Sequence, residues 1–339
     1  MLYGHGDDGY RFKADIVADF STNVWYGGEP EGLKEHIFSN WNTINKYPEV
    51  LAESLSKKIG EHHGLQKDNI LVNSGSTESI YLVAQAFRQK KTAIVIPAFA
   101  EYEDAAKMYG HEVSFIDWQQ LNPSTQIKTE LLFLCNPNNP TGEIFNHIEE
   151  LLSNNPQTIF VIDEAFIEFT LSIGSSVLLV NKYKNLIILR SLTKAYAIPG
   201  LRLGYMVSSV EMIDTLKQFK YPWSVNTIAL ETGKFIFDNY PDIQLPLKDL
   251  LKDKESFINA LEEVPVNILN SHTHFFLVQL LNSEASTLKQ YLIKNHGILI
   301  RDASNFRGLK SGHFRIATLS AAKNQLLVNA LKEWKNHTS

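Results

Sequence analysis

The middle of the chain alternates short, continuous apolar runs with stretches in which apolar residues recur at helical spacing. The apolar runs begin the segments 69–75, 92–97, 131–142, 158–166 and 185–191. Helical stretches follow the first three of them, at 76–89, 98–110 and 143–155. Apolar runs without in-and-out alternation are typical of strands covered on both faces, and their spacing suits crossover helices. The pattern predicts an α/β protein built on a doubly wound, largely parallel sheet.

The pattern changes after about residue 240. Residues 240–264 begin with prolines and continue as a long amphipathic helix. The remaining chain predicts strand, helix, strand, strand and helix, at 275–280, 283–297, 298–302, 313–317 and 321–334. This order indicates a second, smaller α+β unit. Because the N-terminal residues contain too little to fold alone, we assign them to it, which gives a large domain of residues 45–240 and a small domain of residues 1–44 and 241–339.

Composition narrows the possible function classes. Of 339 residues, 44% are hydrophobic and 20% are charged, which is ordinary for a globular enzyme and excludes a disordered or fibrous chain. The formal net charge is −5 and the cations are scattered, which argues against a nucleic-acid surface. Cys135 is the single cysteine, so an internal disulfide and a cysteine-based metal site are excluded. Because no signal-peptide pattern and no run of about eighteen apolar residues occurs, we expect a cytoplasmic protein that does not enter a membrane.

Ligands of open α/β sheets bind beyond the carboxyl ends of the strands, so motifs at those ends are candidates for chemistry. In VNSGSTES, Gly75, Ser76 and Thr77 stand between a predicted strand and a predicted helix. Such a turn presents free backbone N–H groups and the positive end of the helix dipole, which suits a phosphate. An ordinary N-cap is the alternative interpretation, because serine and threonine favour that position.

Two other strand ends carry polar side chains. The segment CNPNNPTGE, residues 135–143, offers asparagines that could donate to a ligand, although its two X-Pro units equally suit a plain turn. Asp163 ends the strand of VIDEAF, where a carboxylate is costly to bury unless it meets a cation, such as a protonated ring nitrogen. An aspartate that caps a neighbouring helix is an equal alternative on this motif alone.

The segment SLTKAYAIPGLRLGY, residues 191–205, places a lysine and an arginine among apolar residues. Desolvation lowers the pKa of a lysine, and the neutral amine is the nucleophile that forms Schiff bases, which makes Lys194 a candidate. A surface lysine whose stem covers apolar area is the alternative. Arg202 brings a planar fork suited to phosphate. Together with PAFAEY and NNPTG, these motifs describe a pocket for a phosphorylated pyridine aldehyde.

Across nearly the whole chain, this set of motifs resembles the fold type I enzymes that depend on pyridoxal 5'-phosphate (PLP), in the aminotransferase class I/II group. The resemblance implies the PLP-dependent transferase fold of type I, with PLP as the cofactor. Lys194 would bind the cofactor covalently and shuttle a proton, and Asp163 would pair with the pyridinium nitrogen. Asn139 resembles the residue that bonds the ring hydroxyl, and Phe99 resembles the aromatic residue stacked on the ring.

The resemblance also implies how phosphate and substrate are held. The positions that match phosphate ligands, next to Gly75, are Ser76, Thr77, Ser191 and Arg202. Tyr47, in KYPEV, resembles a tyrosine that reaches the phosphate across a dimer interface, so a homodimer is implied. Arg315, in HFRIA, resembles the arginine that binds the substrate α-carboxylate. The residues expected near a substrate phosphate are His5, Arg11, Arg301 and Asn23.

Two subfamilies are similar to the chain: the histidinol-phosphate aminotransferases and the L-threonine-O-3-phosphate decarboxylases of cobalamin synthesis. The segments that favour the decarboxylases are HGDDGYR (5–11), LTKAYAIPGLRLGY (192–205), PWSVN (222–226) and IRDASNFRGL (300–309). Phe166 also favours the decarboxylases, because the aminotransferases usually carry tyrosine at this position. Without the tyrosine hydroxyl, the ring oxygen of the cofactor has one hydrogen-bond donor fewer, which should change the pKa of the Schiff base and favour loss of CO2. After FSTN, which ends at Asn23, the family's usual Asn-Pro turn is replaced by VWYGG, near where substrate should lie.

The leading hypothesis is a PLP-dependent decarboxylase that converts L-threonine O-3-phosphate to (R)-1-amino-2-propanol O-2-phosphate. The alternative within the family is a histidinol-phosphate-type aminotransferase that uses glutamate and 2-oxoglutarate. A non-catalytic binding or regulatory protein is disfavoured by the retention of Lys194 and Asp163, and a dehydrogenase by the spacing of GLRLG, which does not match a dinucleotide fingerprint. The histidines of HH (62–63) and HTH (272–274) have no carboxylates at a ligand spacing, so no metal site is expected.

Overall fold

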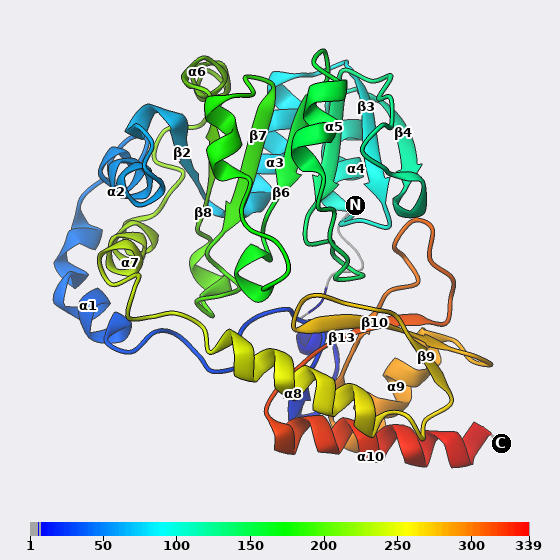
Figure 1. Cartoon of the computed structure of the whole chain (residues 1–339). Coiled ribbons are helices and arrows are strands. Elements are labelled where there is room, and N and C mark those ends of the chain that lie inside the picture. The colour runs from blue at the N-terminus through cyan, green and yellow to red at the C-terminus, as the bar shows by residue number, and fades with distance from the viewer. Residues whose placement is uncertain (1–5, 7, 339) are drawn as a thin grey trace.

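Figure 1 shows the computed structural model of the chain, in which a large sheet flanked by helices lies beside a smaller α+β unit. The structure describes residue 6 and residues 8–338. His5, one of the residues expected near a substrate phosphate, therefore lies outside the described residues.

The large domain is built on a seven-stranded sheet in the order β2-β8-β7-β6-β5-β3-β4. Its strands are β2 (Ile70–Asn73), β3 (Lys91–Ile96), β4 (Glu112–Asp117), β5 (Leu131–Cys135), β6 (Ile159–Asp163), β7 (Leu186–Ser191) and β8 (Gly204–Ser208). Neighbouring strands are parallel except around β8, which is antiparallel to both β2 and β7. The mostly parallel α/β sheet predicted from the apolar runs is confirmed.

Helices cover both faces of this sheet, and each face has its own apolar core. One face carries α3 (Gly75–Ala86), α4 (Glu101–Met108) and α6 (Val210–Lys217); the other carries α2 (Glu53–His63), α5 (Ile148–Asn154) and α7 (Thr227–Asp238). Successive residues of β7 pack in alternate cores: Ile187 and Leu189 lie in the core of the first face, and Ile188 lies in the core of the second. Burial on both faces explains why these strands have continuous apolar sequences.

The small domain has a four-stranded antiparallel sheet in the order β12-β13-β10-β9. Its elements are α8 (Leu247–Ala260), β9 (Val266–Ile268), β10 (Phe275–Leu280), α9 (Ala285–His296), β12 (Arg301–Asp302), β13 (His313–Ala317) and α10 (Ala321–Thr338). The N-terminal segment joins this domain, because β1 (Ala18–Asp19) pairs in parallel with β11 (Ile298–Leu299), and Phe20 lies in its core. Helix α1 (Leu33–Ser39) lies instead beside α7, with Leu33 in the core of the large sheet. The division at residues 44 and 240 stays a prediction.

The strand predicted at 298–302 differs in a way that matters for the site. It is divided at Ile300 into β11, which pairs with β1, and β12, which pairs with β13. The strand is interrupted because β11 belongs to the two-stranded sheet with β1, whereas β12 belongs to the four-stranded sheet of the small domain. As a result, Arg301 comes to lie opposite Arg315 in the β12–β13 register.

Candidate active site

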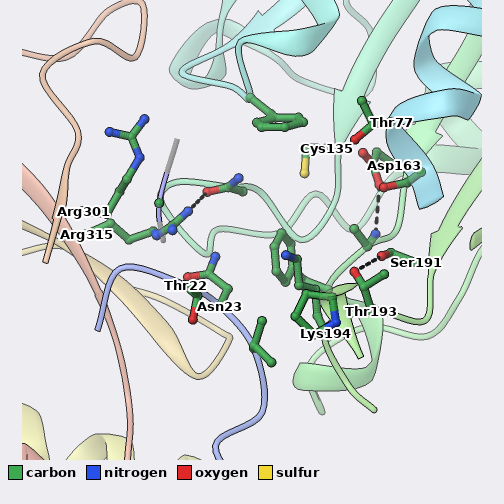
Figure 2. Close-up of a pocket in the computed structure, with 18 of the residues that line it drawn as sticks. Thr22, Asn23, Thr77, Cys135, Asp163, Ser191, Thr193, Lys194, Arg301 and Arg315 are labelled. Atoms are coloured by element: carbon green, nitrogen blue, oxygen red, sulfur yellow. Dashed lines mark hydrogen bonds between the residues drawn. The ribbon is translucent and has the colours of Figure 1, made fainter. Parts of the chain in front are cut away.

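A cavity of about 240 Å³ lies between the two domains, at the carboxyl ends of the central parallel strands. Its walls come from the large sheet, the small domain and the N-terminal segment, as Figure 2 shows for Asp163, Arg315 and Asn23. The predicted site residues that line it are Asn23, Ser76, Thr77, Phe99, Asn139, Asp163, Ser191, Lys194, Arg202, Arg301 and Arg315. The fold therefore gathers into one cavity groups that lie far apart in the sequence.

One end of the cavity collects hydroxyl groups at the start of α3. Backbone N–H groups in the first turn of a helix have no partner within the helix, and the positive end of the helix dipole lies there. The hydroxyls of Ser191 and Thr193 are 2.9 Å apart, and Ser76 and Thr77 line the same cavity. Together these donors suit a phosphate. Thr193 is absent from the predicted residues, and its place on the same turn as Ser191 is the signal that could have found it.

Gly75 and Arg202 fit closely together at this end. Gly75 has a φ of +80°, and a Cβ at this position would lie 2.6 Å from Nη2 of Arg202. A larger residue would therefore displace the guanidinium. Arg202 donates from Nη1 to the carbonyl of Pro199 at 3.0 Å. This packing holds a planar cation beside the helix start, where it can bind phosphate oxygens.

Asp163 ends β6 and is 4% exposed. Its Oδ2 accepts a hydrogen bond from the Tyr102 hydroxyl at 2.7 Å, and its Oδ1 accepts one from the backbone N–H of Ala165 at 3.0 Å. Burial raises the pKa of Asp163 to about 6, against the opposing effect of both hydrogen bonds. A carboxylate in this setting gains stability from a cation brought by a ligand, and a protonated ring nitrogen fits that need.

Tyr102 is a functional candidate that the sequence patterns did not identify. It lies in α4, fully buried, and its ring stacks on Phe133 with centroids 5.3 Å apart. Phe99, at the i−3 position, meets the same ring edge-on with centroids 6.1 Å apart. The spacing of the two aromatic residues in PAFAEY is compatible with one helical face, which is the signal that could have linked Tyr102 to the site.

Lys194 follows β7 and lines the cavity. The residue is half-buried, and its neighbours Leu192 and Ala195 are buried. Its carbonyl accepts a hydrogen bond from the backbone N–H of Trp25 at 2.9 Å, which ties this turn to the N-terminal segment. Figure 2 shows Lys194 beside Thr193. A lysine between apolar neighbours in a cavity suits Schiff-base chemistry better than it suits a surface role.

Two buried arginines line the cavity from the small domain (Figure 2). Burial lowers the pKa of Arg315 to about 9, with a further contribution from the charge of Arg301. Burial likewise lowers the pKa of Arg301 to about 10. Both side chains stay charged at neutral pH, so a bound anion would offset the cost of burying them. This end of the cavity therefore suits a carboxylate, a phosphate or both.

Asn139 and the N-terminal segment orient Arg315. The Oδ1 of Asn139 accepts a hydrogen bond from Nη1 of Arg315, and the carbonyl of Ser21 accepts one from Nη2 at 2.6 Å. Among the described residues, neither polar atom of the Asn23 side chain has a hydrogen-bond partner, although the residue is buried. Buried amides are normally satisfied, so Asn23 is suited to bind a polar ligand group.

Tyr47 and Arg11, two further predicted residues, are not part of the cavity lining. Tyr47 is 84% exposed, and its ring contacts that of Trp223 with centroids 5.2 Å apart. Arg11 is exposed and donates from Nε to the Tyr10 hydroxyl at 3.2 Å. A ligand in the cavity of a single chain would therefore not contact either side chain at these positions.

The histidine pairs have contacts of their own. The distance between Nε2 of His63 and the hydroxyl oxygen of Tyr205 is 2.9 Å. The ring of His274 stacks on that of Phe169, with centroids 3.8 Å apart. Within the described ranges, no group of three or more His, Cys, Asp and Glu side chains is arranged to hold a metal ion. Across the same residues, no helix has the length and apolar character needed to span a membrane.

The chain is similar to known proteins over most of its length. The family model of aminotransferase class I and II matches residues 15–331. The crystal structure of L-threonine-O-3-phosphate decarboxylase from Porphyromonas gingivalis has a TM-score of 0.90 and 38% identity, and the match covers 94% of this chain and 99% of that one. The threonine-phosphate decarboxylase of Salmonella typhimurium is 32% identical over 94% of this chain and 91% of its own length. Histidinol-phosphate aminotransferase 1 of Carboxydothermus hydrogenoformans is 34% identical over 90% of this chain and 89% of its own length.

Proposed function

Because the chain belongs to the aminotransferase class I and II family, whose enzymes use PLP, we propose that it decarboxylates L-threonine O-3-phosphate to (R)-1-amino-2-propanol O-2-phosphate. One observation carries the proposal: the cavity that contains Lys194 and Asp163 also contains two buried arginines. A substrate with both a carboxylate and a phosphate needs two cationic positions. The similarity to two threonine-phosphate decarboxylases adds independent support.

The residues of the cavity fit PLP in their chemistry. The hydroxyl set at the start of α3 and the Arg202 guanidinium would bind the phosphate, and Asp163 would meet the ring nitrogen. Asn139 would bond the ring hydroxyl, and Phe99 would cover one face of the ring. When bound, PLP supplies an electron sink for the electron pair that the departing CO2 leaves behind.

Lys194 and Asp163 would carry out the chemistry that belongs to the chain itself. Lys194 would bind the cofactor aldehyde through Nζ, release it to the substrate amine, and then hold at Nζ the proton that replaces the carboxylate on the substrate carbon. Asp163 would stay ionised beside the positive ring nitrogen, because an adjacent cation lowers the pKa that burial has raised.

The arginines would orient the substrate. Arg315, held by Asn139 and Ser21, would bind the α-carboxylate, and Arg301 with Asn23 would bind the phosphate. Which bond breaks depends on which one lies perpendicular to the ring, so holding both ends of the substrate selects the reaction. His5 and Arg11 stay predictions as additional phosphate ligands.

Transamination is the alternative function, and the 34% identity with a histidinol-phosphate aminotransferase favours it. In that reaction the cavity would bind histidinol phosphate, with glutamate and 2-oxoglutarate as the second pair of substrates. Purified holoenzyme given either phosphorylated substrate separates the two functions, because only decarboxylation releases CO2 and only transamination interconverts 2-oxoglutarate and glutamate.

We also propose a cytoplasmic homodimer in which Tyr47 reaches the phosphate site of the partner. Tyr47 contacts the exposed ring of Trp223, and three further aromatic side chains close to these two residues in the sequence are exposed: Phe38, Trp41 and Tyr221. The ring pairs Phe38–Trp41 and Tyr47–Trp223 have centroids 6.1 and 5.2 Å apart. Exposed aromatic residues gathered in this way are typical of a protein interface, and a second copy of the chain is the partner that would bring Tyr47 to a phosphate.

A further inference from the structure

The loop of residues 303–309, part of the segment between β12 and β13, extends from the small domain to the large sheet. In Figure 1 it belongs to the orange loop that extends toward β3 and β4. We propose that the ion pair between Arg307 of this loop and Glu103 of α4 clasps the two domains together and thereby positions Arg301 in the cavity. The part of Arg301 in binding substrate phosphate rests on the proposed function, whereas the clasp itself does not.

The ion pair has a geometry that isolated surface pairs usually lack. Nε of Arg307 donates to Oε2 of Glu103 at 2.9 Å, and Nη2 donates to Oε1 at 2.7 Å. The guanidinium also lies over the ring of Phe115, 4.1 Å from its centroid. The hydrogen bond from Arg307 is the largest of the effects that lower the pKa of Glu103. Two parallel hydrogen bonds and a stacked ring fix the guanidinium in one orientation.

The Arg307–Glu103 pair supports the loop where a second cavity separates the loop from α4. This cavity of about 410 Å³ is lined by Glu103, Phe115 and Arg307 together with Phe99 and Phe306. Phe99 and Phe306 also line the active-site cavity, so their rings form the wall between the two. Open space behind a wall removes the support of packing from that side. The clasp spans this cavity from the loop to α4.

The loop residues next to Arg307 contact Arg301. The Oδ1 of Asn305 accepts a hydrogen bond from Nη2 of Arg301 at 2.8 Å, and the ring of Phe306 lies 4.9 Å from the Arg301 guanidinium carbon. Phe306 packs with Leu277 and Ala303 of the small domain. If Arg307 were released, the loop would keep its packing on the small domain but lose its support from the large domain, and Asn305 would then hold Arg301 less firmly. Arg307 and Glu103 are therefore positioning residues.

Hydrogen–deuterium exchange of the holoenzyme tests the clasp without any substrate. The variants are Glu103→Gln, Arg307→Gln and the exchanged pair Glu103→Arg with Arg307→Glu. Lys182→Gln is the control, because it removes a pair with Glu149 at 2.7 Å that lies away from both cavities. We expect exchange in residues 303–309 to be roughly three- to tenfold faster in each single variant. The exchanged pair should slow it again, and the control should match the wild type.

Steady-state kinetics test the consequence for Arg301. With whichever phosphorylated substrate the wild type converts, each single variant should raise KM by roughly three- to tenfold and change kcat by less than about twofold. Exchange that is unchanged in both single variants would overturn the clasp. Faster exchange with an unchanged KM would overturn the positioning of Arg301. Failure of the wild type to convert either phosphorylated substrate would count against the proposed function, and exchange would still decide the clasp.

Discussion

Asp163 is buried at the end of β6, and two hydrogen bonds stabilise its charged form. Burial has the opposite effect and raises its pKa to about 6. This pKa lies just below neutral pH, so a further rise would leave part of the carboxyl group uncharged at neutral pH. Because Asp163 is proposed to pair with the ring nitrogen of PLP, which needs an ionised partner, the donors that stabilise its charge should strengthen cofactor binding.

Removing the Tyr102 hydroxyl should weaken cofactor binding in a pH-dependent way. Tyr102→Phe removes a donor to the charged carboxylate, so the pKa of Asp163 should rise above its present value of about 6. PLP affinity should fall as pH decreases through this pKa, and in the variant the fall should begin at a higher pH. Near neutral pH we expect a loss of roughly tenfold, measured as the dissociation constant of PLP. Tyr205→Phe, which removes a buried hydroxyl bonded to His63, is the control. A Tyr102→Phe profile that coincides with the wild type would exclude this role.

Phe166 is the residue on which the choice of reaction is predicted to depend. It is 5% exposed, lines the cavity and packs edge-on against Phe275 with ring centroids 4.9 Å apart. Phe166→Tyr would add a donor near the ring oxygen of the cofactor and stabilise its charged form. The pKa that governs the visible absorbance of the holoenzyme should then decrease by about one unit. A spectroscopic pH titration that gives the same pKa for both proteins would contradict this role for Phe166.

The role of a single residue could be predicted from the sequence where a reactive or charged side chain stands at the end of a predicted strand. Asp163 and Lys194 each follow an apolar run, and a carboxylate or amine at such a place needs an explanation. Tyr102 was not predictable in the same way. Its hydroxyl meets Asp163 only because α4 packs on the sheet so that the Tyr102 ring stacks on Phe133 of β5, and a contact of that kind leaves no pattern in the local sequence.

The start of α3 is the proposed binding site of the PLP phosphate. Gly75→Ala should raise the dissociation constant of PLP by roughly tenfold or more. The new Cβ would displace the Arg202 guanidinium, and alanine is strained at the φ of +80° found here. Gly64→Ala is a matched control, because its φ is +66° but a Cβ there would meet nothing within 4 Å. Both variants carry the backbone strain, and only Gly75→Ala creates the collision. Equal PLP dissociation constants for the two variants would show that the collision has no effect.

The elements were predictable where local pattern alone defines them. Fully buried strands such as β5 and β7 have continuous apolar sequences, and the pattern located both. The edge strand β4 has no fully buried residue, so its sequence carries no such signal. The division of 298–302 into β11 and β12 depends on the partners β1 and β13, which the local sequence does not reveal. The same division places Arg301 opposite Arg315, so this part of the site could not be predicted as a pair.

The whole molecule should be a dimer. The exposed aromatic group around Tyr47 would be covered in the dimer, so Trp223→Glu and Phe38→Glu should each shift the protein toward monomers at micromolar concentration. Sedimentation velocity would measure this shift. Leu178→Glu, at another exposed apolar residue of the large domain, should leave the mass unchanged. A wild-type protein that sediments as a single 38.5 kDa chain would contradict the homodimer and the role of Tyr47.

The large sheet, the small domain and the N-terminal segment all contribute to one cavity, and its two buried arginines suit a substrate with both carboxylate and phosphate. Carboxyl-labelled L-threonine O-3-phosphate therefore tests the function most directly. With the holoenzyme, we expect labelled CO2 and the aminopropanol phosphate in equal amounts, without 2-oxoglutarate, and neither product from a Lys194→Ala variant. Retention of the label in the amino acid, together with glutamate formation from 2-oxoglutarate and histidinol phosphate, would contradict decarboxylation and show an aminotransferase instead.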